Sequence, residues 1–220
     1  MTQQPLIRRR TAVATALLVG AGLATPSAVF AQAGKSALNL AMVAEPPTLD
    51  IQSTPADLVC IIMQHVYEPL FTFDANSSLV PMLAEAMPKI SDDGKLYTIA
   101  LRKGVKLHSG RELNADDVVA SLKRWMEVSP RGKSVAAQVA DLVAKGPLNV
   151  EISLKNAYAP LLSQLAMASG MAAIMAKESL AQPLRDYVGT GPYKFKERRP
   201  DQYVLLTRFD GYLARAEAAS

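Results

Sequence analysis

Polar and apolar residues alternate along several short stretches of the chain, which is the pattern of a strand with one buried face. The clearest example is LNVEISLK (148–155), in which every second residue is apolar. A continuous apolar run at 171–175 is consistent with a strand buried on both faces. The pattern therefore predicts strands at 37–43, 70–74, 95–102, 105–108, 148–155, 171–175, 193–196 and 203–207.

Other stretches place apolar residues three and four positions apart, the spacing of one face of a helix. The best specified of them is 115–127. Asn114 is the expected N-cap of this helix, because its side chain can accept a hydrogen bond from the amide of Asp117. Further helices are predicted at 56–67, 135–145, 159–168 and 176–182. Together these elements predict a mixed α+β protein with many hairpins and few long helices.

Residues 1–31 have the composition of a secretory signal peptide. Three arginines are followed by an apolar run and then by small residues that permit cleavage after Ala31 or Ala33. The apolar run is too short for a transmembrane helix, which needs roughly 20 residues. We therefore expect export, by the general secretory route or by the twin-arginine route that the arginine pair would also fit.

The net charge of the exported part is close to neutral. The whole chain has 24 Lys+Arg against 20 Asp+Glu, but residues 1–31 hold three of the cations and no acid. The remaining 21 cations and 20 acids give no support for a nucleic-acid or membrane-surface partner. The single cysteine, Cys60, lies in the apolar run LVCIIM and is expected to be a buried thiol.

The stretch GTGPYKFK (189–196) could be a phosphate-binding loop or a turn that leads into a strand. A phosphate-binding loop needs a helix directly after its glycines, whereas Pro192 and the alternating residues after it predict a strand. The two glycines are then expected to supply backbone freedom at a tight turn. The phosphate-binding interpretation is therefore set aside.

The chain carries no recognisable pattern of catalytic or metal-ligating residues. Of its two histidines, His65 is expected in the core or in a cleft, and His108 at the edge of a strand. The G-x-S-x-G, H-E-x-x-H and C-x-x-C patterns of hydrolases and metal sites are missing. We predict no catalytic residue, no metal site and no cofactor, so binding becomes the leading class of function.

Five segments together resemble one protein family. They are EPPTLD (45–50), VYEPLFTFD (66–74), LVPMLAEAM (79–87), the block 92–125 and VGTGPYKFKE (188–197). On these segments the chain resembles the periplasmic solute-binding proteins of peptide/nickel-type ABC importers, known as family 5. The block 92–125 is the most specific of the five, because it joins an LRKGVKLHSG turn to a capped helix.

The resemblance implies a periplasmic binding protein-like lobe with an inserted smaller subdomain. Parts of the first main lobe would be 36–72 and 185–220, and the inserted α+β subdomain would be 73–184. Family members usually have several hundred residues in two lobes. We therefore expect this chain to be the N-terminal portion, truncated before the second lobe, and to bind poorly or not at all by itself.

The resemblance also implies a periplasmic location and a function, in which a monomer that is not an enzyme binds a solute and delivers it to an ABC permease by hinge closure. Peptide is the expected solute, and the carboxylate of Glu45 would suit a peptide amine. The expected ligand contacts are Glu45, Pro46, Thr48, His65, Tyr67, Gly189 and Thr190. Two alternatives stay open, an exported hydrolase without a recognisable motif and a degenerate fragment that binds nothing.

Overall fold

The computed structural model describes residues 37–215, so the expected signal peptide lies outside the described residues. The helices are α1 (Asp57–Met63), α2 (Ala115–Val128), α3 (Pro130–Ala136), α4 (Leu161–Ala166) and the 3-10 helix η1 (Lys177–Ser179). The strands are β1 (Phe71–Phe73), β2 (Leu79–Pro81), β3 (Lys89–Ile90), β4 (Leu96–Ala100), β5 (Val139–Ala144), β6 (Asn149–Leu154), β7 (Tyr193–Arg199) and β8 (Tyr203–Arg208). Within 37–215, no helix has the length and apolar character needed to cross a membrane.

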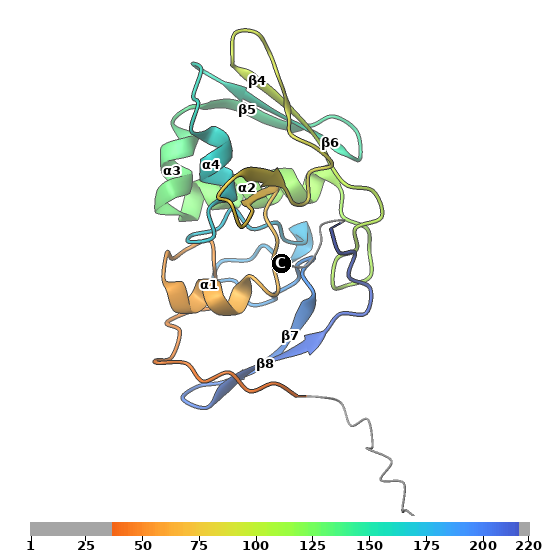
Figure 1. Ribbon diagram of the computed structural model, residues 1–220. Coiled ribbons are helices and arrows are strands. Elements are labelled where there is room, and N and C mark those ends of the chain that lie inside the picture. The colour runs from red at the N-terminus through yellow and green to blue at the C-terminus, as the bar shows by residue number, and fades with distance from the viewer. Residues whose placement is uncertain (1–36, 216–220) are drawn as a thin grey trace, which may run out of the picture. The chain divides into compact units, whose positions relative to one another are not determined.

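A four-stranded antiparallel sheet, in the order β3-β4-β6-β5, forms the larger layer. Apolar residues of β4 and β6 stand opposite one another, with Tyr97 beside Ile152 and Ile99 beside Val150. These four side chains are buried, because the alternating pattern places them on the same face of the pleat. Figure 1 shows α2, α3 and α4 gathered on one side of this sheet.

Helix α2 forms as its sequence predicts. The side chain of Asn114 accepts a hydrogen bond from the amide of Asp117 at 3.1 Å, and the Asp117 carboxylate accepts one from the amide of Asn114 at 3.0 Å. This reciprocal pair satisfies two of the backbone amides that a helix start leaves open. Trp125, on the inner face of the helix, is fully buried and donates from Nε1 to the carbonyl of Gly170 at 2.9 Å.

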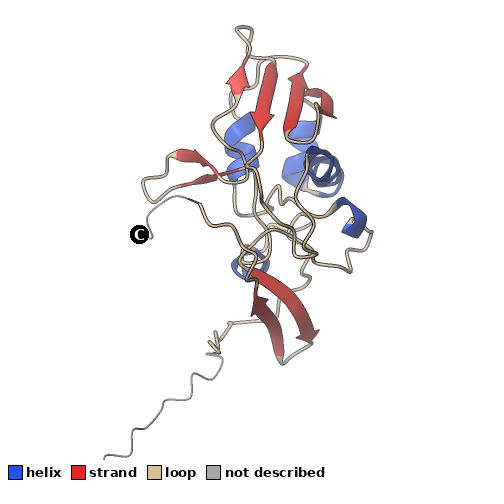
Figure 2. Cartoon of the chain, turned by 90° about the vertical axis from the view of Figure 1, so that its right-hand side faces the viewer, coloured by secondary structure: helices blue, strands red, loops and turns tan. Residues whose placement is uncertain are grey.

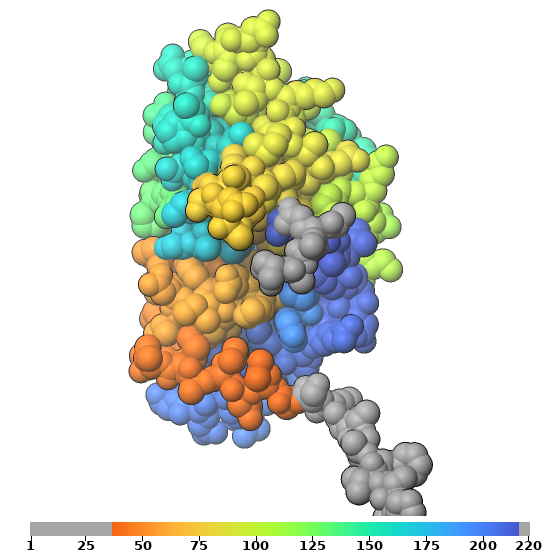
Figure 3. Space-filling model, viewed as in Figure 1, coloured from red at the N-terminus to blue at the C-terminus, as the bar shows by residue number. Residues whose placement is uncertain are grey.

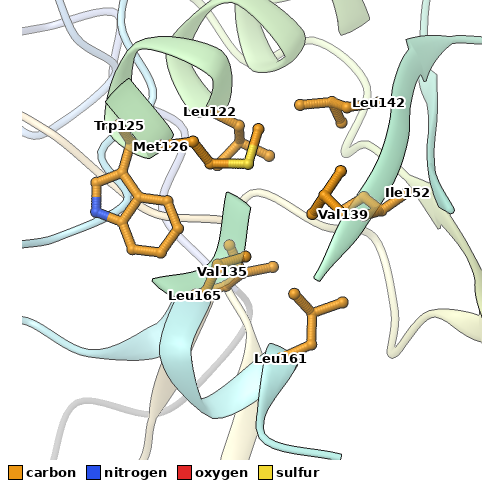
Figure 4. Close-up of a pocket in the computed structure, with 9 residues that line it drawn as sticks. All are labelled: Leu122, Trp125, Met126, Val135, Val139, Leu142, Ile152, Leu161 and Leu165. Carbon is orange, nitrogen blue, oxygen red and sulfur yellow. The ribbon is translucent and has the colours of Figure 1, made fainter. Parts of the chain in front are cut away.

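The core beneath the sheet is closely filled. Nine apolar side chains from α2, α3, α4, β5 and β6 surround one gap, as Figure 4 shows. The gap has a volume of about 10 Å³, which is barely enough for one water molecule. This interior therefore stabilises the subdomain and offers no room for a solute.

A second apolar cluster joins α1 to the segment 171–175 and to the hairpin of β7 and β8. Its buried members include Met63 and Tyr67, and Phe195 and Leu206 pack against them from the hairpin. Figure 2 shows this hairpin as the pair of long strands at the bottom of the view. The described core thus has two clusters, while the predicted boundaries at 72/73 and 184/185 stay predictions.

The prediction of a helix at 135–145 is wrong. Helix α3 ends at Ala136, and Val139–Ala144 is strand β5, which pairs antiparallel with β6. The residues of β5 would fit either structure by periodicity alone. These residues form a strand because they pair with the edge of β6 that β4 leaves free, which puts Leu142 beside Ile152.

Three predicted strands are also wrong or incomplete. Residues 37–43 form no strand, and among the described residues no other strand pairs with them. The segment 105–108 contributes only a single bridge, between Lys106 and Glu112. The segment 171–175 is buried as predicted, yet it pairs only through the bridge of Ile174 with Glu68. An isolated strand gains too little from its own backbone to form without a paired neighbour.

Candidate functional site

The glycine loop 189–191 lies directly against the segment that follows α1. The amide of Gly191 donates to the carbonyl of Val66 at 3.0 Å, and the amide of Tyr193 donates to the carbonyl of His65 at 3.0 Å. Two stretches that are more than 120 residues apart are therefore joined by their backbones. This contact brings together His65, Tyr67, Gly189 and Thr190, four of the residues predicted to contact ligand.

Gly189 and Gly191 lie so close to neighbouring atoms that neither position has room for a side chain. A Cβ atom on Gly191 would lie 2.5 Å from the carbonyl oxygen of His65, and one on Gly189 would meet the Val66 carbonyl and the ring of Tyr67. Neither glycine has a positive φ. The expectation that they supply backbone freedom is therefore wrong, since their function is to let two backbones approach closely.

His108 holds the loop from the other side. Its backbone amide donates to the carbonyl of Gly189 at 2.8 Å, its Nε2 lies 2.9 Å from the carbonyl oxygen of Gly191, and its Nδ1 accepts from the amide of Gly189 at 3.3 Å. The side chain is buried. The expected position at the edge of a strand is wrong, because residue 108 lies in none of the described strands. Burial lowers the pKa of His108, because the neutral ring fits this environment better than the charged one.

Thr190 points into the protein and meets a buried acid. Its Oγ1 donates to Oε2 of Glu68 at 2.6 Å, and the hydroxyl of Tyr212 donates to Oε1 of the same carboxylate at 3.0 Å. Burial raises the pKa of Glu68, and burial together with the neighbouring carboxylate raises the pKa of Tyr212 to about 12. Sequence reasoning missed Glu68, although an acid flanked by apolar residues in VYEPLF is a signal of a buried, bonded carboxylate.

The turn that carries Glu45 is bound to the hairpin. The Glu45 carboxylate accepts from Nη2 of Arg198 at 2.6 Å and from the amide of Asp201 at 2.7 Å, and the carbonyl of Pro46 accepts from Arg198 at 2.7 Å. Arg198 therefore lowers the pKa of Glu45. Thr48 is engaged locally, since its Oγ1 accepts from the amide of the second residue after it at 3.1 Å.

The predicted ligand contacts thus fall into two groups. Glu45, Pro46 and Thr48 lie in the turn held by Arg198, while the remaining four lie around the glycine loop. Within the second group, His65 is half-buried and its ring meets Tyr193 edge-on, with ring centroids 5.9 Å apart. Whether either group touches a ligand stays a prediction.

The side chain of Tyr67 is buried in full, but its hydroxyl has no hydrogen-bond partner among the described residues. Burial raises the pKa of this hydroxyl well above the ordinary value of a tyrosine. The ring lies where a side chain at Gly189 would clash with it. The ring of Tyr67 therefore packs against the glycine loop at Gly189.

An open hollow of about 510 Å³ lies beside the loop. Its lining includes the cations Arg185, Lys194 and Lys196 and the aromatic rings of Tyr187 and Phe195. Within residues 37–215, no group of histidines, cysteines and acids is arranged to hold a metal ion. The lining also includes the acids Glu178 and Asp186, so the hollow presents charges of both signs, which suit recognition of a polar solute.

Comparison with known proteins identifies the family. The family described as "Bacterial extracellular solute-binding proteins, family 5 Middle" matches residues 78–219. A probable peptide ABC transporter periplasmic-binding protein of Sinorhizobium fredii is 30% identical over 220 residues, which cover 96% of this chain and 41% of the relative. A glutathione-binding protein of Escherichia coli is 30% identical over 199 residues, covering 89% of this chain and 39% of the relative.

Solved structures show the same likeness. A dipeptide-binding protein of Pseudoalteromonas in complex with Met-Leu has a TM-score of 0.70 and 30% sequence identity, over 78% of this chain and 39% of that one. The predicted periplasmic binding protein-like fold, with mixed α and β structure, is confirmed. The chain spans about two fifths of the length of these relatives. It belongs to the bacterial extracellular solute-binding proteins of family 5.

Proposed function

We propose that this chain forms part of the solute-binding component of an ABC importer and supplies one side of a cleft that closes on its ligand. The observation that carries the proposal is the structural likeness to a dipeptide-binding protein that holds Met-Leu. The described residues support a role in binding, because hydrogen bonds to His108 and Glu68 fix the position of the glycine loop. A site that is fixed before the ligand arrives loses less entropy on binding.

The proposed ligand is a peptide or a small peptide-like solute. Its support comes from the relatives, whose names include a peptide-binding, a dipeptide-binding and a glutathione-binding protein. A peptide presents a charged amine, a charged carboxylate and amide groups. The hollow is lined by the cations Arg185, Lys194 and Lys196, which suit a carboxylate, and by the acids Glu178 and Asp186, which suit an amine, through charge-assisted hydrogen bonds.

One side of a cleft cannot enclose a solute. Two-lobed binders bury the ligand between both lobes when the hinge closes, and most of a small ligand's surface is buried in such sites. We therefore propose that the isolated 220-residue chain binds peptides poorly. The remaining parts of the proposal are a periplasmic location, inferred from the relatives, and delivery to a membrane permease.

A chimera tests the ligand class. Residues 41–215 would replace the structurally equivalent part of the Pseudoalteromonas dipeptide-binding protein, and calorimetry would measure binding of Met-Leu, glutathione and a nickel–histidine complex. We expect binding of Met-Leu in the micromolar range or tighter, and weaker binding of the nickel complex. A chimera that folds but binds none of the peptides would contradict the proposal. Preference for the nickel complex would contradict the assignment of peptide.

A further inference from the structure

The acid Glu68 lies at the crossing of three segments. Its own segment follows α1, and its backbone is bridged to Ile174, whose amide donates to the Glu68 carbonyl at 3.0 Å. Figure 3 shows the stretch containing α1 (orange) directly below residues near 160–175 (cyan). The side chain is only 2% exposed, so nearly everything the carboxylate touches is protein.

The two carboxylate oxygens of Glu68 each accept a hydroxyl from a different segment. Oε2 takes Thr190 of the glycine loop, and Oε1 takes Tyr212 of the segment 209–215, which we call the exit segment. A carboxylate can accept from several donors at once, and hydrogen bonds to a charged acceptor are about twice as strong as neutral ones. Glu68 is therefore a shared partner through which the two segments are joined.

The exit segment has further contacts at both ends, among them a hydrogen bond from Nη1 of Arg215 to the carbonyl of Pro81 at 3.3 Å. Arg102 donates from Nη2 to the carbonyls of Leu213 and Ala214, at 2.9 and 2.8 Å, and the amide of Phe209 donates to the carbonyl of Pro192 at 2.8 Å. Leu213 itself is 43% exposed. Phe209, at the start of the segment, is 7% exposed and its ring meets that of His108 edge-on, with centroids 5.1 Å apart. Packing therefore holds the segment at Phe209, while polar contacts hold it around Tyr212 and Leu213.

We infer that Glu68 is a positioning residue that couples the exit segment to the glycine loop, so that displacement of either segment is transmitted to the other through its carboxylate. The inference deepens the proposed function, on which it rests. If the glycine loop lines the closing cleft, Glu68 links that loop to the exit segment through its hydrogen bonds with Thr190 and Tyr212.

Hydrogen exchange on the 220-residue chain tests the coupling without any ligand. The variant Thr190→Val keeps the shape of the side chain and removes the hydroxyl that meets Glu68. We expect the amide of Tyr212 to exchange about tenfold faster, the effect of losing a hydrogen bond to a charged group. The matched control is Thr207→Val, at an exposed threonine of β8, which should leave this amide unchanged.

The route of the coupling is tested in the Glu68→Met background, because methionine has a similar volume and no strong hydrogen-bonding group that could bridge the two hydroxyls. There, Thr190→Val should no longer affect the amide of Tyr212. If its effect persists, the two segments communicate by another path, such as the contact of Phe209 with Pro192, and the inference is overturned. It is equally overturned if Thr190→Val leaves the exchange of Tyr212 unchanged in the otherwise natural chain.

A double-mutant cycle covers the case in which Glu68→Met does not fold. Thr190→Val and Tyr212→Phe each remove one hydroxyl and leave the acid in place. Residues that share one partner have non-additive effects on stability, so the double variant should differ from the sum of the single ones. Additive effects would overturn the inference. None of these outcomes depends on peptide binding, so failure here and failure of the proposed function can be told apart.

Discussion

The Nε2 atom of His108 lies 2.9 Å from the carbonyl oxygen of Gly191. This contact needs a proton on Nε2, while the amide of Gly189, at 3.3 Å from Nδ1, needs a lone pair on the other nitrogen. The neutral ring with its proton on Nε2 satisfies both. A second proton on Nδ1 would face the donor of Gly189 and break the clamp on the glycine loop.

The first prediction concerns pH. The folded pKa of His108 is below the ordinary value of 6.5, so the unfolded chain binds more protons between those two values. The free energy of unfolding should therefore be highest above pH 6.5 and should fall as the pH is lowered through the folded pKa. Urea unfolding at a series of pH values between about 5 and 8 measures this dependence.

The variant His108→Gln isolates the histidine in that experiment. Glu68, whose pKa is raised by burial, acts with the opposite sign, since its contribution to stability is lost as the pH rises through its folded pKa. Glutamine at 108 does not titrate and leaves Glu68 unchanged. The difference in free energy of unfolding between the natural chain and His108→Gln should grow toward neutral pH. Equal pH dependence in both chains would contradict the assigned role of His108.

The second prediction concerns the close approach at Gly191. Its replacement by alanine would place Cβ 2.5 Å from the His65 carbonyl oxygen and 2.8 Å from the Val66 carbonyl carbon. Because both obstacles are backbone, we expect a loss of about 2–4 kcal/mol in the free energy of unfolding. At Gly104, which has φ +73° and nothing within 4 Å, alanine should cost only about 1 kcal/mol. Equal losses would show that space is not the reason for Gly191.

The third prediction concerns the buried pair of Arg124 and Asp50, which joins α2 to the segment before α1. Arg124 is 6% exposed and donates to both carboxylate oxygens of Asp50, at 3.1 and 2.6 Å. The variant Arg124→Met leaves the carboxylate without its cation, so we expect a loss of about 3–5 kcal/mol in chemical denaturation.

An exposed ion pair provides the control for that measurement. Arg208 and Asp210 lie 3.5 Å apart with side chains that are 83% and 92% exposed. The variant Arg208→Met should change stability by less than about 0.5 kcal/mol, because water already solvates both charges. A comparable loss in both variants would mean that burial does not strengthen the effect of removing the partner of Asp50.

Much of the fold could be predicted from local pattern. Helix α2 was predictable because its cap, Asn114, its acidic first turn and its apolar face all favour the same structure. Strand β5 was not, because its residues gain their structure from the neighbouring β6. The segment 37–43 has the alternating polar and apolar residues of a strand, but this pattern does not show whether a neighbouring strand is available to pair with it.

The candidate site was less predictable than the fold. The turn signal of the glycine loop was visible, yet its contacts with His108 and Glu68 join residues that are 83 and 122 positions apart. Periodicity carries no information about such pairs. For the same reason, sequence alone did not reveal that the carboxylate of Glu45 is engaged by Arg198, 153 residues away.

The central claim is that this chain supplies one side of a closing cleft for a peptide. Calorimetric titration of Met-Leu, into the 220-residue chain and into the chimera with the Pseudoalteromonas protein, tests it most directly. We expect no measurable heat of binding for the chain alone and a micromolar or tighter Kd for the chimera. Micromolar binding by the chain alone would contradict the claim, because it would show that these residues enclose a peptide without a second lobe.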